Sequence, residues 1–261
     1  MTPANANSLK QLFLPKEHGS WSLALEPIVL ALLVAPSAAG ALLALAGIAG
    51  FFTRRPLKFA ITLPADDPRR APAWIGAILF ALLAAAAQGG AAILGPPHAL
   101  WPLLLAAPFG ALFLWFDLRN AAREAEAELA GSMAFALVPA SGAMLAGWPA
   151  PVALALAALA LARSAPTVLT VRTYLRLGKG EDPSAFPSLV AAGVAFATVA
   201  LLARQGLVPS VAVAVSTVLL LRTGWLVSPL RPHWPARQLG VMEAILGVIH
   251  LTVLAAAYHL R

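Results

Sequence analysis

Residues 150–171 read APVALALAALALARSAPTVLTV, an apolar run whose one charged residue is Arg163. A helix needs about 20 mainly apolar residues to cross the roughly 30 Å hydrocarbon core of a bilayer. This run meets that length, so we expect a membrane-spanning helix with an arginine near its middle.

Similar apolar runs occur on both sides of it, separated by short breaks. We therefore expect an all-α fold, a polytopic transmembrane helix bundle of about nine spans, at residues 21–35, 37–53, 72–88, 98–116, 128–147, 150–171, 186–204, 207–227 and 239–258. The first two runs are short and adjacent, and a single re-entrant hairpin is the alternative for them. We treat 1–261 as a single transmembrane domain in which 1–20 form a retained cytoplasmic segment, because the first apolar run contains Glu26 and Pro27, unlike a cleaved signal peptide.

The composition excludes several classes of protein. The chain is 60% hydrophobic and 11% charged, whereas soluble domains carry roughly 25% charged residues. Cysteine is absent, which excludes disulfides, thiol catalysis and cysteine-ligated metal. The histidines lack metal-ligand spacing, so we expect no metal and no cofactor. The net charge of +7 fits cytoplasmic loops better than nucleic acid, since no basic run interleaves with aromatic residues.

The charges are distributed unevenly between the two sides of the predicted bundle. Fifteen of the 18 Lys and Arg residues lie in or next to the N-terminal segment and every second connection, Arg222 among them. The positive-inside rule then predicts a multi-pass protein of the cytoplasmic membrane, with its N-terminus in the cytoplasm and its C-terminus outside. All eleven acidic residues belong to the same half, which indicates a polar working face there.

The segment PKEHGSW at 15–21 precedes the first span. It places the imidazole of His18 at the membrane interface, although Lys and Trp are also ordinary anchors at that depth. The segment resembles the opening motif of the YwiC-like family of bacterial membrane proteins. FFTRRPL at 51–57, ELAG at 128–131 after Arg123, and RSAPTVLTVRTYLR at 163–176 extend the resemblance. It implies a membrane protein and no particular reaction.

A more distant resemblance is to the UbiA superfamily of intramembrane prenyltransferases. It implies nine helices and a cytoplasm-facing site between the connections after the second and sixth spans. The aspartate-rich motifs of that superfamily, which hold Mg²⁺, are missing: Arg54 and Arg55 stand at the first place, and Arg172, Tyr174 and Arg176 at the second. An enzyme of this kind would be a transferase without the usual metal-binding aspartates.

Arginine binds phosphate or carboxylate through a planar fork and needs no metal to do so. The four arginines Arg54, Arg55, Arg172 and Arg176 could therefore form a clamp for an anionic headgroup. The alternative is that they are ordinary charges flanking the spans.

Arg163 is different because it lies inside a span, where a charge costs about 2.5–3.5 kcal/mol on insertion scales. Such a residue normally has a partner in the bundle, and Glu26 and Glu243 are the candidates. Glu128 is near enough in sequence to pair with Arg123. A purely structural ion pair is the alternative.

Two functional hypotheses follow, beside that of a non-catalytic scaffold. The first is a protein that binds a membrane lipid or isoprenoid-like amphiphile at the arginine clamp, with Arg123, Glu128 and Tyr174 nearby. If it is an enzyme of the UbiA kind, His18 and Glu26 are its catalytic candidates. The second is a secondary transporter of a small organic anion, with Arg163 as the binding charge and Glu26 or Glu243 as its proton-coupled partner.

Overall fold

The computed structural model describes residue 13 and residues 18–260, except for the side chains of residues 18–20 and 23. Within that part the chain is entirely helical. The helices are α2 His18–Val34, α3 Ala38–Thr62, α4 Arg70–Leu94, the short 3-10 turn η1 Pro97–Leu100, α5 Trp101–Leu118, α6 Ala125–Ala136, α7 Val138–Leu145, α8 Ala150–Gly178, α9 Phe186–Arg204, α10 Val211–Val227 and α11 Ala236–His259.

These elements form nine helical segments in the described chain, because η1 continues into α5 and α6 into α7. The expectation of an all-α, polytopic helical bundle is confirmed, and the nine segments coincide with the nine runs expected as spans. Six of the segments are long and apolar enough to cross a membrane by length and hydropathy. The apolar parts of α2 and α10 are shorter, and α3 carries three basic residues in its C-terminal third. The break between α6 and α7 falls at Leu137, just before Pro139, which lacks the N–H for a regular helical hydrogen bond.

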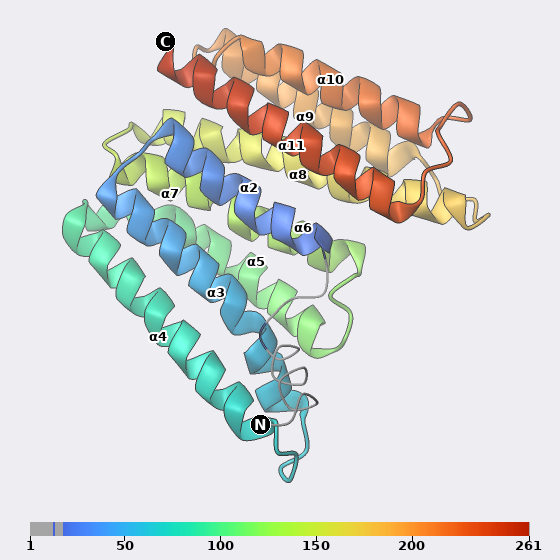
Figure 1. Cartoon of the computed structure of the whole chain (residues 1–261). Coiled ribbons are helices and arrows are strands. Elements are labelled where there is room, and N and C mark those ends of the chain that lie inside the picture. Colours follow the sequence, from blue (N-terminus) through green and yellow to red (C-terminus); the bar gives the residue numbers. More distant parts are fainter. Residues whose placement is uncertain (1–12, 14–17, 261) are drawn as a thin grey trace.

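Successive segments run in opposite directions, so the connections alternate between two ends of the bundle (Figure 1). We call the end with the connections 63–69, 119–124, 179–185 and 228–235 the polar end. We call the end with the connections 35–37, 95–96, 146–149 and 205–210 the apolar end. At the apolar end, α9 ends before Gly206, whose φ of 72° is one that glycine adopts readily.

The segments differ in how deeply they lie in the bundle. The α6–α7 segment and α8 are the most buried spans, whereas α4, α5 and α9 expose most of their surface. α2 contacts α3, α6, α7 and α11, so it lies at the centre of the bundle (Figure 1). α4 packs along α3 as an outer pair. The outer faces of α4, α5 and α9 are rich in exposed Leu, Ile and Val, as expected for contact with lipid.

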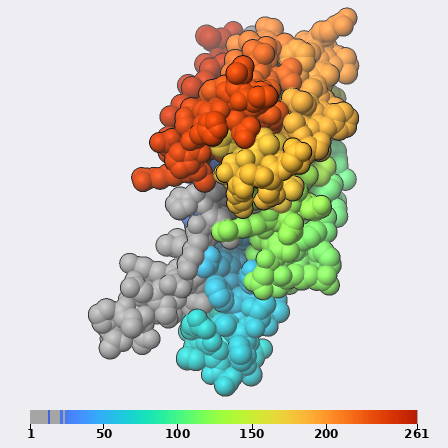
Figure 2. Space-filling view, turned by 90° about the vertical axis from the view of Figure 1, so that its right-hand side faces the viewer, coloured from blue at the N-terminus to red at the C-terminus, as the bar shows by residue number. Residues whose placement is uncertain are grey.

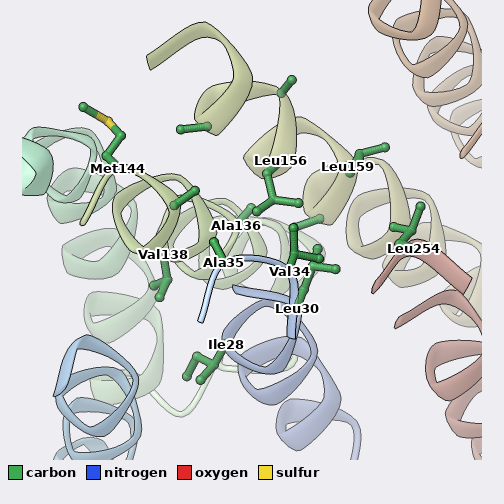
Figure 3. Packing of buried hydrophobic residues seen from close by; sticks show 14 of the residues in the cluster. Ile28, Leu30, Val34, Ala35, Ala136, Val138, Met144, Leu156, Leu159 and Leu254 are labelled. Carbon is green, nitrogen blue, oxygen red and sulfur yellow. The ribbon is translucent and has the colours of Figure 1, made fainter. Parts of the chain in front are cut away.

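The apolar core fills the half of the bundle toward the apolar end. Figure 3 shows Leu30 and Val34 of α2 packed near Leu156 and Leu159 of α8 and Leu254 of α11. These side chains are at most 4% exposed. Small residues allow close helix contact: a side chain at Gly142 of α7 would lie 3.2 Å from Ala31 of α2. The core therefore closes this half of the bundle.

Candidate functional site

Four charged side chains from four helices meet inside the bundle. Glu26 comes from α2, Arg163 from α8, Arg222 from α10 and Glu243 from α11. Arg163 is 4% exposed and Arg222 is 7% exposed. We call these four residues the internal quartet. Its formal charge is zero, since it has two guanidinium groups and two carboxylates.

Glu243 is the best-held member of the quartet. Its Oε2 lies 3.2 Å from Nη1 of Arg163, and its Oε1 accepts a hydrogen bond from Nη2 of Arg222. Its backbone carbonyl also accepts from Nη2 of Arg163 at 2.9 Å. Both carboxylate oxygens are therefore satisfied by cations, and Arg163 is fixed at two points on α11.

Glu26 is held more loosely. In the described structure its ion pair is with Nε of Arg163, at 3.5 Å from Oε2, and its side chain is 20% exposed. The carboxylate lies against α11 at Gly247, where a Cβ would come within 2.4 Å of Oε1. A residue other than glycine at 247 would therefore displace Glu26.

Two of the helices carry a proline next to these charges. Pro27 follows Glu26 in α2, and Pro166 lies three residues after Arg163 in α8, and both helices continue through the proline. A proline inside a helix removes one backbone hydrogen bond. Beside Pro166, the Thr167 hydroxyl donates to the Arg163 carbonyl at 2.7 Å and accepts from Nη1 of Arg163 at 2.5 Å.

Two small cavities meet at Arg163. The first, of about 30 Å³, lies between α2, α8 and α11 and is lined by Glu26, Arg163, Glu243 and His250 among others. The second, of about 10 Å³, lies between α8, α9 and α10 and is lined by both arginines together with Thr167, Ser216 and Thr223. One water needs a cavity of about 10–15 Å³. The first cavity therefore accommodates about two waters and the second at most one.

Several polar groups at these cavities are buried without a hydrogen-bond partner among the described residues. They are both ring nitrogens of His250, the hydroxyl of Ser164 and Nε of Arg222. Buried polar atoms are normally paired in proteins, and exceptions call for an explanation such as a bound water or ligand. These groups thus leave hydrogen-bonding capacity at the two cavities that no described residue uses.

The quartet lies inside the bundle but nearer the polar end. Glu26 and Glu243 are eight and seven residues from the starts of their helices, which is about 10–12 Å at about 1.5 Å per residue. Arg163 is 13 residues from the start of α8 at the apolar end, or about 20 Å. The apolar core of Figure 3 lies between the quartet and the apolar end.

A second group of charges lies at the polar end, around Asp117 at the end of α5. Its carboxylate is 3.2 Å from Nε of Arg54 and 2.9 Å from Nζ of Lys58, both on α3. Arg54 also lies over the ring of Phe113, 5.0 Å from its centroid. Asp117 is 4% exposed, so this is a buried charge cluster that joins α3 to α5.

A third group joins α8 to the connection between α5 and α6. Arg172 lies 3.5 Å from Glu128 and 4.0 Å from Glu124, and it donates to the carbonyl of Arg123. The end of α8 and the α5–α6 connection are neighbours on the face that Figure 2 presents. These side chains are about a third exposed or more, so solvent weakens their attraction.

The other predicted site residues at the polar end also make contacts with neighbouring residues. Arg176 is paired with Glu181 at 2.6 Å. The hydroxyl of Tyr174 donates to the carbonyl of Pro232 at 2.6 Å and accepts from the N–H of Trp234 at 2.8 Å, which fixes the α10–α11 connection. Arg55 lies over the ring of Phe59, 5.5 Å from its centroid.

The structure thus brings some of the predicted site residues together. Arg163 meets both of its predicted partners, Glu26 and Glu243. Glu128 pairs with Arg172. Arg123 joins this group through its backbone carbonyl, which accepts a hydrogen bond from Arg172. The side chain of His18 lies outside the described residues.

The sequence interpretation did not identify Asp117, His250 or the role of Arg222. We expected Arg222 next to a polar-end connection, but it lies five residues inside α10 and is buried. The apolar run that surrounds Arg222 was the signal in the sequence that this residue could be buried. Asp117 likewise stands at the end of an apolar run, and its partners are about 60 residues away in sequence.

Comparison with known proteins gives one match. The model of the YwiC-like protein family matches residues 14–141. This stretch contains Glu26 and the Asp117 cluster, whereas Arg163, Arg222 and Glu243 lie beyond it. No curated protein and no solved structure matches the chain. The resemblance to the UbiA superfamily therefore has no support from these comparisons.

Proposed function

We propose that the protein is a membrane carrier for a small organic anion, in which Arg163 is the binding charge. The observation that carries the proposal is the internal quartet with its two cavities. Ionisable residues inside a membrane bundle are rare and commonly mark a substrate or ion pathway. Two guanidinium groups beside these cavities are suited to an oxyanion.

The prolines beside the quartet also fit a carrier. Pro27 of α2 and Pro166 of α8 lie next to Glu26 and Arg163, and each removes one backbone hydrogen bond from a helix that is otherwise continuous. Such positions are where a helix bends most easily. The cavities are small, so the structure corresponds to a closed form from which the helices must separate to admit an anion.

A second candidate is supported by the position of the quartet. It lies nearer the polar end, and the apolar core of Figure 3 closes the other half of the bundle. A protein that binds an amphiphile from the polar end would need no opening at the apolar end. Its headgroup would bind Arg54, Arg55, Arg172 and Arg176, with His18 and Glu26 as catalytic candidates. The carboxylates now paired with three of these arginines would have to be displaced, as Glu26 would be in the carrier. We rank this candidate second because the two cavities described above are lined by the quartet arginines and not by these four.

In both candidates the polar end faces the cytoplasm. The support is the positive-inside rule, because Lys and Arg gather at the polar-end connections. A cysteine placed in the connection 179–185 should react with an impermeant maleimide in inverted vesicles and be protected in right-side-out cells. The opposite pattern would reverse the orientation.

The carrier is tested with the purified full chain and three probes: L-lactate, succinate and inorganic phosphate. We expect at least one probe to raise the thermal midpoint in detergent and to be taken up by proteoliposomes above protein-free vesicles. Arg163→Lys should lower this uptake by about tenfold, the equivalent of one charge-assisted hydrogen bond. Arg204→Gln, an exposed arginine at the apolar end, is the matched control and should take up the probe like the wild type.

The double variant Arg163→Gln/Glu26→Gln guards against misfolding, because it keeps the quartet neutral. It should remain monodisperse in detergent and lose uptake to the protein-free level. Wild-type uptake by this folded variant would refute Arg163 as the binding charge, and no uptake of any probe by the wild type would refute the carrier. The second candidate would gain if native mass spectrometry found a co-purified phospholipid or isoprenoid phosphate that is lost when all four polar-end arginines are changed to Gln.

A further inference from the structure

The two carboxylates of the internal quartet are held very differently, and this difference suggests separate roles. Glu243 accepts from two arginine side chains, and its backbone carbonyl accepts from Arg163 as well. Glu26 has one described ion pair, at 3.5 Å. Protonating Glu243 would remove the counter-ion shared by two buried arginines, whereas protonating Glu26 loosens a single contact.

We propose that Glu26 takes up one proton when an anion binds Arg163, so that the carrier moves one H⁺ with each monovalent anion. This inference deepens the proposed function and rests on it. In the free form the quartet is neutral. When the proton adds to a carboxylate oxygen of Glu26, Nε of Arg163 loses its partner and the quartet carries one positive charge. A monovalent anion at Arg163 then restores neutrality, so the anion and the proton are carried across the bilayer together without net charge.

The surroundings of Glu26 fit this role. It lines the 30 Å³ cavity, where a water could deliver the proton. Gly247 of α11 leaves room for its carboxylate, which would not fit beside a Cβ. When Glu26 is neutral it needs no cation, so Nε of Arg163 is released while both Nη atoms stay on Glu243. Arg222, Thr167 and Ser216 line the second cavity beside Arg163 and offer further donors.

The other ionisable groups around Glu26 are accounted for by helix. α8 contributes Arg163, and α11 contributes Glu243 and His250 to the same cavity. Arg222 of α10 reaches it through Glu243. α7 has no ionisable side chain. α6 has Glu126 and Glu128 near the polar end. On α3, Arg54 and Lys58 are paired with Asp117, and Arg55 lies over the ring of Phe59. On α2 itself, the His18 side chain lies outside the described part of the chain.

His250 is the competing proton acceptor. It is 6% exposed, and neither ring nitrogen has a hydrogen-bond partner in the described structure. We favour Glu26 because Glu26, and not His250, is in ion-pair contact with Arg163. The experiment must therefore include both residues.

The first arm of the test requires no transported ligand. Infrared difference spectra of the detergent-purified full chain between neutral and mildly acidic pH should show a protonated carboxyl band that Glu26→Gln removes. Gly247→Ala should shift or remove this band because its Cβ displaces Glu26. Gly240→Ala, on the same helix with open space around its Cβ, should leave it unchanged. A band that persists in Glu26→Gln would overturn the inference.

The second arm measures coupling in proteoliposomes with L-lactate as the monovalent probe and protein-free vesicles as background. A pH gradient should drive accumulation in the wild type, whereas a potassium diffusion potential set with valinomycin should not. Glu26→Gln should lose accumulation by about tenfold, a change of about 1.4 kcal/mol. Exchange of lactate between the two sides should remain measurable because Arg163 still binds the anion.

The outcomes separate the two claims. Uptake driven by membrane potential, or coupling lost in His250→Asn but kept in Glu26→Gln, would overturn the role of Glu26 and leave the carrier standing. If neither lactate, succinate nor phosphate binds or is taken up by the wild type, the proposed function falls and the coupling falls with it.

Discussion

The internal quartet and the arginines at the polar end are built from the same residue types but differ in surroundings. At the polar end, Arg54 pairs with Asp117 of α5 and Arg172 pairs with Glu128 of α6, so these pairs connect helices. Arg176 pairs with Glu181 in the connection that follows its own helix. In the quartet, two arginines and two glutamates lie deep in the bundle, beside cavities and beside polar atoms that have no hydrogen-bond partner among the described residues. The polar-end charges therefore hold segments together, whereas the quartet lies next to unused hydrogen-bonding groups, which is the basis of the proposed carrier.

The most severe test of this difference is Glu243→Ala. It leaves Arg163 and Arg222 buried without their shared counter-ion, and breaking a buried pair in this way costs about 3–5 kcal/mol. We expect this loss in the free energy of unfolding measured by denaturant titration in detergent micelles. The double variant Arg222→Met/Glu243→Met leaves the Arg163–Glu26 pair neutral and should recover most of the loss. An unchanged stability in Glu243→Ala would mean that the quartet does not form.

A smaller effect is expected at the buried cluster of the polar end. Asp117→Asn removes the charge that Arg54 and Lys58 share, and a hydrogen bond to a charged group contributes about 1.5–3 kcal/mol. Thermal unfolding in detergent should show the loss, with lactate uptake kept in proportion to the folded protein. If Asp117→Asn abolished uptake at full stability, the polar end would be part of the site and the contrast would fail.

The exposed pairs should contribute less. Arg172→Gln removes contacts with Glu124 and Glu128 that solvent screens, and such pairs contribute about 0–1 kcal/mol. We expect a shift in the thermal midpoint near the limit of detection. Loss of phospholipid binding in this variant, by contrast, would favour the amphiphile hypothesis over the carrier.

The smallest effect should come from the connection 63–69. The Arg69 side chain, which donates to the Asp67 carboxylate, lowers the pKa of Asp67 to about 2, below the usual value of about 3.9. Since the folded pKa is lower than the unfolded one, the contribution of Asp67 is complete above about pH 4 and is lost as the pH falls toward about 2. Asp67→Asn should lower the thermal midpoint slightly at neutral pH. At a pH below about 2, where the carboxyl is protonated in both states, it should leave the midpoint unchanged. An equal difference at both pH values would exclude the charge as its cause.

The sequence predicted the spans well because hydropathy reports contact with lipid directly. It was less accurate at helix ends. The second span was expected to end at residue 53 and the sixth at 171, but α3 continues to Thr62 and α8 to Gly178. Helices can extend beyond the bilayer, where Arg54, Lys58, Arg172 and Arg176 no longer lower their stability. The α6–α7 break was also missed, although Pro139 was visible in the sequence.

The site was partly predictable for a different reason. A charge in the middle of an apolar run requires a partner, so Arg163 could be matched with Glu26 and Glu243 before the fold was known. Arg222 and Asp117 lie closer to helix ends, where a charge can either reach water or turn inward. That choice depends on how each helix is rotated in the bundle, and rotation follows from tertiary packing rather than from the local sequence.

The way α11 is attached has a mechanical consequence. This helix packs chiefly against α2 and less closely against α10. It meets α8 through apolar side chains such as Leu254 and, nearer the polar end, through charged side chains across a cavity. Electrostatic contacts weaken when their charges change, whereas apolar contacts do not. The two halves of α11 are therefore attached differently, and only the half nearer the polar end depends on the charge of Glu26 and Glu243.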